Sequence, residues 1–202
     1  AYGAGLGFIA NMLEKRYERV SIGASYPYGD LRVTGSHPMI DVLWSSSGTQ
    51  VMHDGAAFSR VERTEMVAGF PPAHKALHVC QAEGATNCSR CEKCFRTMLT
   101  IEVLGVRERF ANCFDWSVFG IDKVASVITV GGGLPIFYRE ILDAAKQRGR
   151  ADIVRELDKA IKRSNLIAPL LSGEAARENH ETIWSLVSVL EGNEVQPTDD
   201  PD

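Results

Sequence analysis

Apolar positions near the start of the chain follow a helical period and then a strand. Residues 3–17 predict a helix, because apolar side chains recur along them at helical spacing, at Leu6, Phe8, Ile9, Met12 and Leu13. Residues 20–23 form a short apolar run that predicts a strand. Small residues at Ala4, Gly5 and Gly7 suit a helix that lies close against a sheet.

A second strand and a second helix are predicted further along. The polar stretch 25–36 is followed by residues 49–53, which can form a strand that ends at the turn Asp54-Gly55. Ser59 is a candidate N-cap with Glu62 three residues later, the pattern of a capping box. We expect this helix to run to about residue 68.

The next elements complete an alternating order. Residues 77–79 predict a short strand or an extended segment, and residues 92–104 predict a helix that ends at Gly105. Because helices and strands alternate, the sequence favours the α/β class with a partial parallel sheet and flanking helices.

The remaining chain predicts a helical portion. Residues 134–148, 151–163 and 174–190 each show a helical pattern, and the tail 196–202 is acidic and contains proline. The predicted organisation has four parts: a partial α/β domain at 1–78, a metal-binding segment and its helix at 79–105, a helical portion at 106–195 and a flexible tail at 196–202.

Composition limits the functional class. The chain has 202 residues, 45% hydrophobic content and a net charge of −4, which indicate a globular protein and argue against a generally basic nucleic-acid binder. No apolar run reaches the length of a membrane span, and the start has no features of a signal peptide. We therefore expect a cytoplasmic protein without a membrane partner. Its oligomeric state is open, a homodimer included.

Four of the five cysteines lie within fifteen residues, at Cys80, Cys88, Cys91 and Cys94. The spacing C-x7-C-x2-C-x2-C lets four thiolates surround one Zn²⁺ ion tetrahedrally, which leaves no position for a water molecule. The sequence thus predicts a structural zinc site.

Other interpretations of these cysteines are two disulfides, an iron–sulfur cluster, or a Cys3His site in which His78 replaces one thiolate. Disulfides fit poorly, since nothing else in the sequence indicates secretion. The fifth cysteine, Cys113, is expected to be a buried apolar residue.

A family resemblance is carried by three features: the strand end Ser21-Ile-Gly-Ala-Ser25, the helix that begins near Ser59, and the cysteine segment followed by a helix. Over about residues 3–105 the chain resembles the second half of PP-loop ATP pyrophosphatases, and among them the 7-cyano-7-deazaguanine synthase-like proteins. The strings 36–41, 53–55 and 87–98 look closer still to uncharacterised bacterial PP-loop-like proteins. The resemblance implies cleavage of ATP, with Mg²⁺, to AMP and pyrophosphate and adenylation of a small-molecule substrate.

One departure from the family is large. Its Ser-Gly-Gly-x-Asp-Ser phosphate loop does not occur in this sequence, and the first strand is also missing, so we expect an additional upstream segment. The glycines 131–133 follow an apolar run at 127–130 and precede a predicted helix, but Lys and Ser/Thr are lacking where a phosphate loop needs them. These glycines are either an anion site or a turn. This chain alone is expected to be inactive, and its catalytic residues are unknown.

Candidate nucleotide- or substrate-binding residues come from two segments. Arg60 and Arg63 share one helix face and could reach a phosphate, or form a solvated face with Glu62 and Glu65. Ser36, His37 and Asp41 lie in a loop where α/β proteins bind ligands, although His37 could instead be a turn residue. The same argument applies to His53-Asp54 at a strand end.

Two other functions are compatible with the sequence. One is a non-catalytic scaffold that keeps zinc for stability. The other is a zinc-stabilised nucleic-acid-binding module, in which Arg90, Lys93 and Arg96 around the cysteines form a small basic patch.

Overall fold

The computed structural model describes residues 2–32, 35–80, 84, 86–124 and 134–167. The predicted helix at 174–190, the tail at 196–202 and the glycines at 131–133 lie outside this part. The chain divides into an N-terminal unit, Ala1–Phe70, and a C-terminal unit, Pro71–Asp202. The second unit thus holds the four cysteines together with the helices that follow them.

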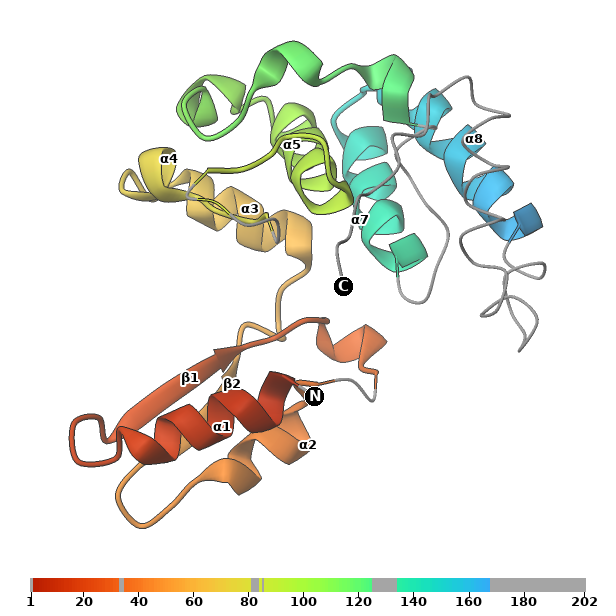
Figure 1. Cartoon of the computed structure of the whole chain (residues 1–202). Coiled ribbons are helices and arrows are strands. Elements are labelled where there is room, and N and C mark those ends of the chain that lie inside the picture. Colours follow the sequence, from red (N-terminus) through yellow and green to blue (C-terminus); the bar gives the residue numbers. More distant parts are fainter. Residues whose placement is uncertain (1, 33–34, 81–83, 85, 125–133, 168–202) are drawn as a thin grey trace, which may run out of the picture. The chain divides into compact units, whose positions relative to one another are not determined.

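The N-terminal unit contains two parallel strands, β1 (Arg19–Gly23) and β2 (Gln50–Asp54), shown in Figure 1. Ile22 pairs with His53, and Gly23 pairs with Asp54. The prediction of a parallel sheet is therefore confirmed for these two strands. Because the strands are parallel, their carboxyl ends meet at one edge, close to residues 24 and 54.

Helix α1 (Tyr2–Met12) contributes small residues to the core of this unit. Ala10 is buried with Ile22 and Val51, and the partly buried Val20 and Trp44 pack against them. A Cβ atom on Gly7 would lie 2.5 Å from Cγ of Trp44, and one on Gly3 would overlap the carbonyl oxygen of Gly35. The helix thus approaches its neighbours through residues that have little or no side chain.

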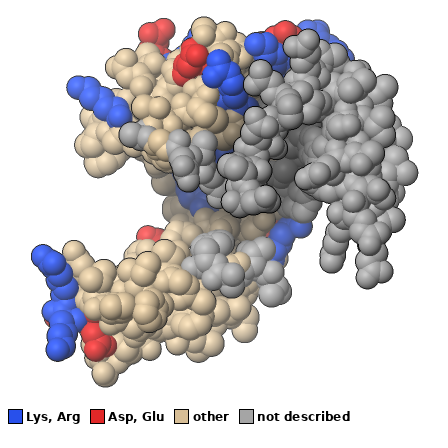
Figure 2. Space-filling model, viewed as in Figure 1, with Lys and Arg blue, Asp and Glu red and all other residues tan. Residues whose placement is uncertain are grey.

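This geometry corrects the prediction for the first helix. The helix ends at Met12 rather than at residue 17, and large apolar side chains at residues 6–13 are exposed. They are Leu6, Phe8, Ile9, Met12 and Leu13. Figure 2 shows that the face of the N-terminal unit in view carries few charged side chains. The close approach expected for the small residues is present at Gly7, while a Cβ atom on Gly5 would meet nothing within 4 Å.

Short turns and a capped helix complete this unit. Helix α2 (Pro38–Asp41) and the 3₁₀ turn η2 (Val42–Trp44) precede β2, and the turn η1 (Tyr28–Asp30) follows β1. Helix α3 (Arg60–Ala68) begins at Ser59, whose side chain accepts from the Glu62 amide while the Glu62 carboxylate accepts from the Ser59 amide. The predicted capping box is confirmed.

The C-terminal unit is helical in the part described. Its helices are α4 (Ala73–Ala76), α5 (Glu92–Leu104), α7 (Leu134–Gln147) and α8 (Ala151–Ile167), with the 3₁₀ turns η3 (Arg107–Phe110), η4 (Trp116–Val118) and η5 (Ile121–Lys123). Residues 77–79 form no strand and lead into the cysteine segment. Gly105 ends α5 with φ 68°, and Gly149 separates α7 from α8 with φ 69°, as helix ends of this kind require.

Helix α5 is the centre of this unit. Its buried side chains include Phe95, Met98, Leu99 and Ile101, and α7 packs against both α5 and α8. In the described ranges, no helix combines the length and the apolar character that crossing a membrane requires.

Candidate functional site

The four clustered cysteines bring their sulfur atoms together. All four Sγ atoms lie within 4.8 Å of one another, with 3.8 Å between Cys80 and Cys91 and 3.9 Å between Cys88 and Cys94. Four thiolates at about 2.3 Å from a tetrahedral zinc ion stand about 3.8 Å apart. All five cysteines are free thiols, so the cluster has no disulfide. The arrangement can hold a metal ion.

The start of α5 positions two of these thiols. Cys91 is the N-cap residue and Cys94 lies in the first turn. Ser89 adopts a positive φ of 62°, which turns the chain between Cys88 and Cys91. The backbone N–H of Cys91 donates to Sγ of Cys88 over 3.3 Å, as N–H groups at helix starts commonly do to anionic ligands.

Asn87 holds the other side of the cluster in place. Its Oδ1 accepts from the backbone N–H groups of Val79 and Cys80, over 2.8 Å and 3.1 Å. Its Nδ2 donates to the carbonyl oxygens of Leu77 and Cys113, over 2.8 Å and 2.9 Å. One amide side chain therefore joins three segments of the chain, which brings Cys80 close to Cys88.

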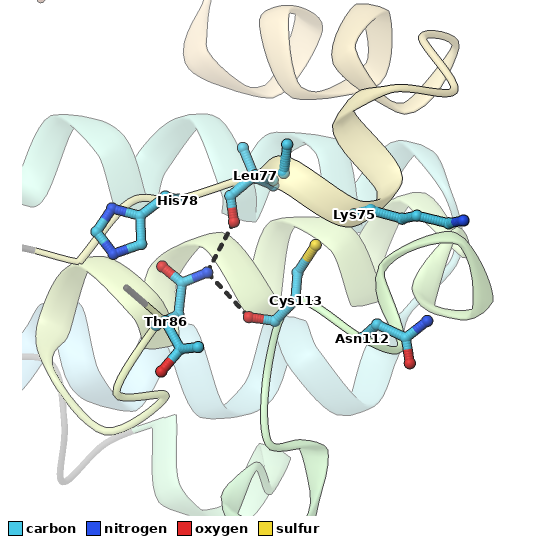
Figure 3. Close-up of a pocket in the computed structure, with 8 residues that line it drawn as sticks. Lys75, Leu77, His78, Thr86, Asn112 and Cys113 are labelled. Carbon is cyan, nitrogen blue, oxygen red and sulfur yellow. Dashed lines mark hydrogen bonds between the residues drawn. The ribbon is translucent and has the colours of Figure 1, made fainter. Parts of the chain in front are cut away.

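Dashed lines in Figure 3 mark the two bonds to the carbonyl oxygens of Leu77 and Cys113, beside a small pocket of about 100 Å³. The pocket is lined mainly by polar groups, including Lys75, His78, Thr86 and Asn112. His78 is exposed and does not belong to the sulfur cluster, so the four cysteines form the candidate site without it. Cys113 is buried, as expected, and its Sγ lies 3.2 Å from the carbonyl oxygen of His74.

Burial raises the pKa of the thiols of Cys91 and Cys94 in the metal-free protein. A metal ion that binds here therefore has to displace protons from these thiols, as thiolate ligation requires.

The cations near the cysteines are mostly engaged. Arg96 is buried, and its guanidinium forms an ion pair of 3.0 Å with Glu92. Arg90 lies near Asp115, whose carboxyl pKa is lowered by hydrogen bonds from Ser117 and in addition by the Arg90 charge. The predicted basic patch thus has two of its three members next to carboxylates.

Glu92 also contacts a residue far along the chain. Its Oε1 accepts a hydrogen bond of 3.0 Å from the Tyr138 hydroxyl. Burial, together with the Glu92 charge, raises the pKa of Tyr138 well above its usual range, so this hydroxyl stays protonated. Sequence analysis did not identify this contact, because no local pattern connects positions separated by 46 residues.

A second cluster lies in the N-terminal unit. Asp41 is fully buried; its Oδ2 lies 2.6 Å from Nδ1 of His53 and accepts from the Ser36 hydroxyl over 2.8 Å. The backbone N–H of His37 donates to Oδ1 over 3.2 Å. Burial raises the Asp41 pKa, but the hydrogen bonds from His53, Ser36 and His37 outweigh it, so the pKa is lowered overall.

The His53 ring is oriented by this carboxylate. Because a carboxylate only accepts, the tautomer with the proton on Nδ1 donates to Asp41, and in that tautomer Nε2 is an acceptor. The side chain is 3% exposed, and in the described part of the chain Nε2 makes no hydrogen bond. The structure therefore brings two of the three predicted loop residues, Ser36 and Asp41, onto His53.

The third loop residue and the two arginines have other contacts. His37 is the N-cap of α2, and its Nδ1 accepts from the Met39 amide over 3.2 Å. Arg63 donates to the carbonyl oxygen of Ala24, and Arg60 donates to that of Ser25 over 3.5 Å. Both arginines thus reach the carboxyl end of β1, while Glu62 serves the capping box instead of pairing with them.

Comparison of the chain with protein-family models, curated proteins and solved structures finds no match.

Proposed function

We propose that the C-terminal unit binds one zinc ion through Cys80, Cys88, Cys91 and Cys94, and that this ion is structural. The observation that supports the proposal is the separation of the sulfur atoms, 3.8 Å and 3.9 Å in the two pairs. These distances suit tetrahedral thiolate ligation, and four protein ligands leave no open position for substrate.

Metal analysis of the purified protein tests this proposal. We expect one zinc per chain and a loss of bound zinc in Cys91→Ser, whereas Cys113→Ser should keep the metal because Cys113 is outside the cluster. Cobalt substitution should give the spectrum of tetrahedral thiolate ligation. A purified chain without metal, or one in which the four sulfurs pair as disulfides, would contradict the proposal.

We further propose that the chain is the C-terminal part of a zinc-containing PP-loop-like ATP pyrophosphatase that adenylates a small molecule. Support comes from the carboxyl ends of β1 and β2, where Arg60, Arg63 and His53 gather. Nε2 of His53 is suited to accept a proton from an acceptor substrate. A zinc-stabilised scaffold without catalysis is the alternative.

Pyrophosphate release from ATP tests the second proposal. The chain alone should release none, because Arg60 and Arg63 donate to backbone carbonyls and a triphosphate also needs a loop of backbone donors. A version extended by a phosphate-binding loop should release pyrophosphate with the right acceptor, and should lose activity on His53→Gln. Release by residues 1–202 that depends on Arg63 would contradict this expectation.

The nucleic-acid alternative is less well supported. Arg96 is buried against Glu92, and Arg90 lies near Asp115, so the local field is largely neutralised.

A further inference from the structure

Glu92 lies within the cysteine cluster and also contacts α7. It follows Cys91 directly and precedes Cys94 by two positions, so its backbone belongs to the turn that the two thiols would fix. Its Oε1 accepts from the Tyr138 hydroxyl over 3.0 Å and pairs with Arg96 over 3.0 Å. One carboxylate oxygen thus serves two buried partners.

Helix α7 binds this ion pair through two adjacent residues. Tyr138 is fully buried, and the guanidinium of Arg96 lies 4.5 Å from the ring centroid of Phe137. The buried hydroxyl and the buried guanidinium both require a partner, since an unpaired polar group in a protein interior is costly. Glu92 accepts the hydrogen bond of the hydroxyl and offers its charge to the guanidinium, whose Nη1 and Nε make no hydrogen bond in the described part of the chain.

Glu92 can fill this role only while the first turn of α5 is formed. The first four N–H groups of a helix have no partner within the helix, so this turn is held by fewer hydrogen bonds than the middle of α5. The side chain of Cys91 makes no capping hydrogen bond. A metal ion that binds Cys91 and Cys94 would hold the turn, and with it the Glu92 carboxylate.

We propose that metal binding at the four cysteines is coupled to the docking of α7 on α5 through Glu92 and Tyr138. This inference rests on the proposed metal centre and adds that the metal controls the attachment of α7 to α5. Removal of the metal loosens the turn, frees Glu92 and weakens the attachment of α7. Because coupling free energies are reciprocal, loss of the Tyr138 hydroxyl weakens metal binding in turn. Glu92 and Tyr138 are positioning residues.

Hydrogen exchange of the full chain tests the coupling, with zinc bound and after removal of zinc by a chelator. In the wild type, chelation should speed exchange in residues 91–96 and in residues 137–145, while residues 99–104 of α5 stay protected. In Tyr138→Phe, exchange at 137–145 should be fast already and should respond little to chelation. Zinc affinity of this variant should fall about tenfold, as for other residues that orient metal ligands.

Tyr28→Phe is the matched control, because Tyr28 is exposed and lies in the other unit. Its zinc affinity and exchange should equal those of the wild type. If the wild type binds zinc but chelation does not change exchange at residues 137–145, the coupling is wrong and the metal centre stands. A uniform loss of protection across α5, α7 and α8 on chelation would have the same meaning. Wild type that binds no zinc overturns the proposed metal centre as well. The wild-type measurements decide the matter even if Tyr138→Phe does not fold.

Discussion

At the scale of single residues, Asp41 joins two segments of the N-terminal unit. The carboxylate accepts from Ser36 and from the backbone of His37 on its own segment, and it binds His53 on β2. Because it is fully buried, its charge depends on these donors for stabilisation.

We predict that Asp41→Asn lowers the free energy of unfolding by about 1–3 kcal/mol, the usual cost of leaving buried partners unsatisfied. Urea denaturation measures this change. Asp54→Asn is a suitable control, since Asp54 is exposed at the end of β2, the strand that carries His53. Equal stability of the two variants would show that the Asp41 bonds contribute nothing.

The same carboxylate predicts a dependence on pH. The pKa of Asp41 in the folded protein is below its ordinary value of 3.8, so the unfolded state binds more protons in acid. Its contribution to stability is complete above pH 3.8 and is lost as the pH falls through the folded value. Denaturation at several pH values should therefore show wild type and Asp41→Asn converging below pH 3.8, and a constant difference would contradict this.

Sequence analysis identified the cysteine cluster but not the contacts of Asp41 with His53. The cysteines are close in sequence, so their spacing alone limits how the sulfurs can meet. The contact of Asp41 with His53 depends on how α2 folds back on β2. No local rule specifies that path.

At the scale of elements, α1 depends on glycines at the positions where other segments come closest. Gly7 faces the Trp44 ring, whereas a Cβ atom on Gly5 would meet nothing within 4 Å. These two glycines of one helix therefore allow a matched comparison.

We predict that Gly7→Ala destabilises the N-terminal unit by about 1–3 kcal/mol, as overpacking usually does. Gly5→Ala should instead stabilise it by about 0.5–1 kcal/mol, because alanine loses less entropy than glycine in a helix. Thermal unfolding of both variants tests the pair. A stabilising Gly7→Ala would mean that α1 does not pack on Trp44.

Element boundaries were predicted well where side chains determine them. Ser59 with Glu62 predicted the start of α3, and Gly105 predicted the end of α5. For α1, the small residues were expected to allow a close approach, and Gly7 does face Trp44, whereas a Cβ atom on Gly5 would meet nothing within 4 Å.

At the scale of the whole molecule, the four clustered cysteines and the cluster of Asp41 with His53 belong to different units. The cysteines belong to Pro71–Asp202, and Asp41 with His53 belongs to Ala1–Phe70. Loss of metal should therefore act on the unit that contains the cysteines.

Tryptophan fluorescence can test this division, because Trp44 lies in the first unit and Trp116 in the second. The chain has a third tryptophan, Trp184, so each variant keeps one of these two and replaces the other together with Trp184. We predict that chelation lowers the denaturation midpoint reported by Trp116 and leaves that of Trp44 unchanged. The variants without chelator serve as controls for the substitutions. Equal shifts at both probes would indicate that the chain unfolds as one cooperative body.

The place of Cys91 at the start of α5 has a kinetic consequence. The slow step in forming a helix is closure of its first turn, which orders several residues in exchange for one hydrogen bond. A metal ion bound by Cys91 and Cys94, as proposed above, would close that turn by ligation, so metal capture would act as the nucleus from which α5 grows. The rate at which the C-terminal unit folds should then rise with the concentration of free metal, as a bimolecular step does.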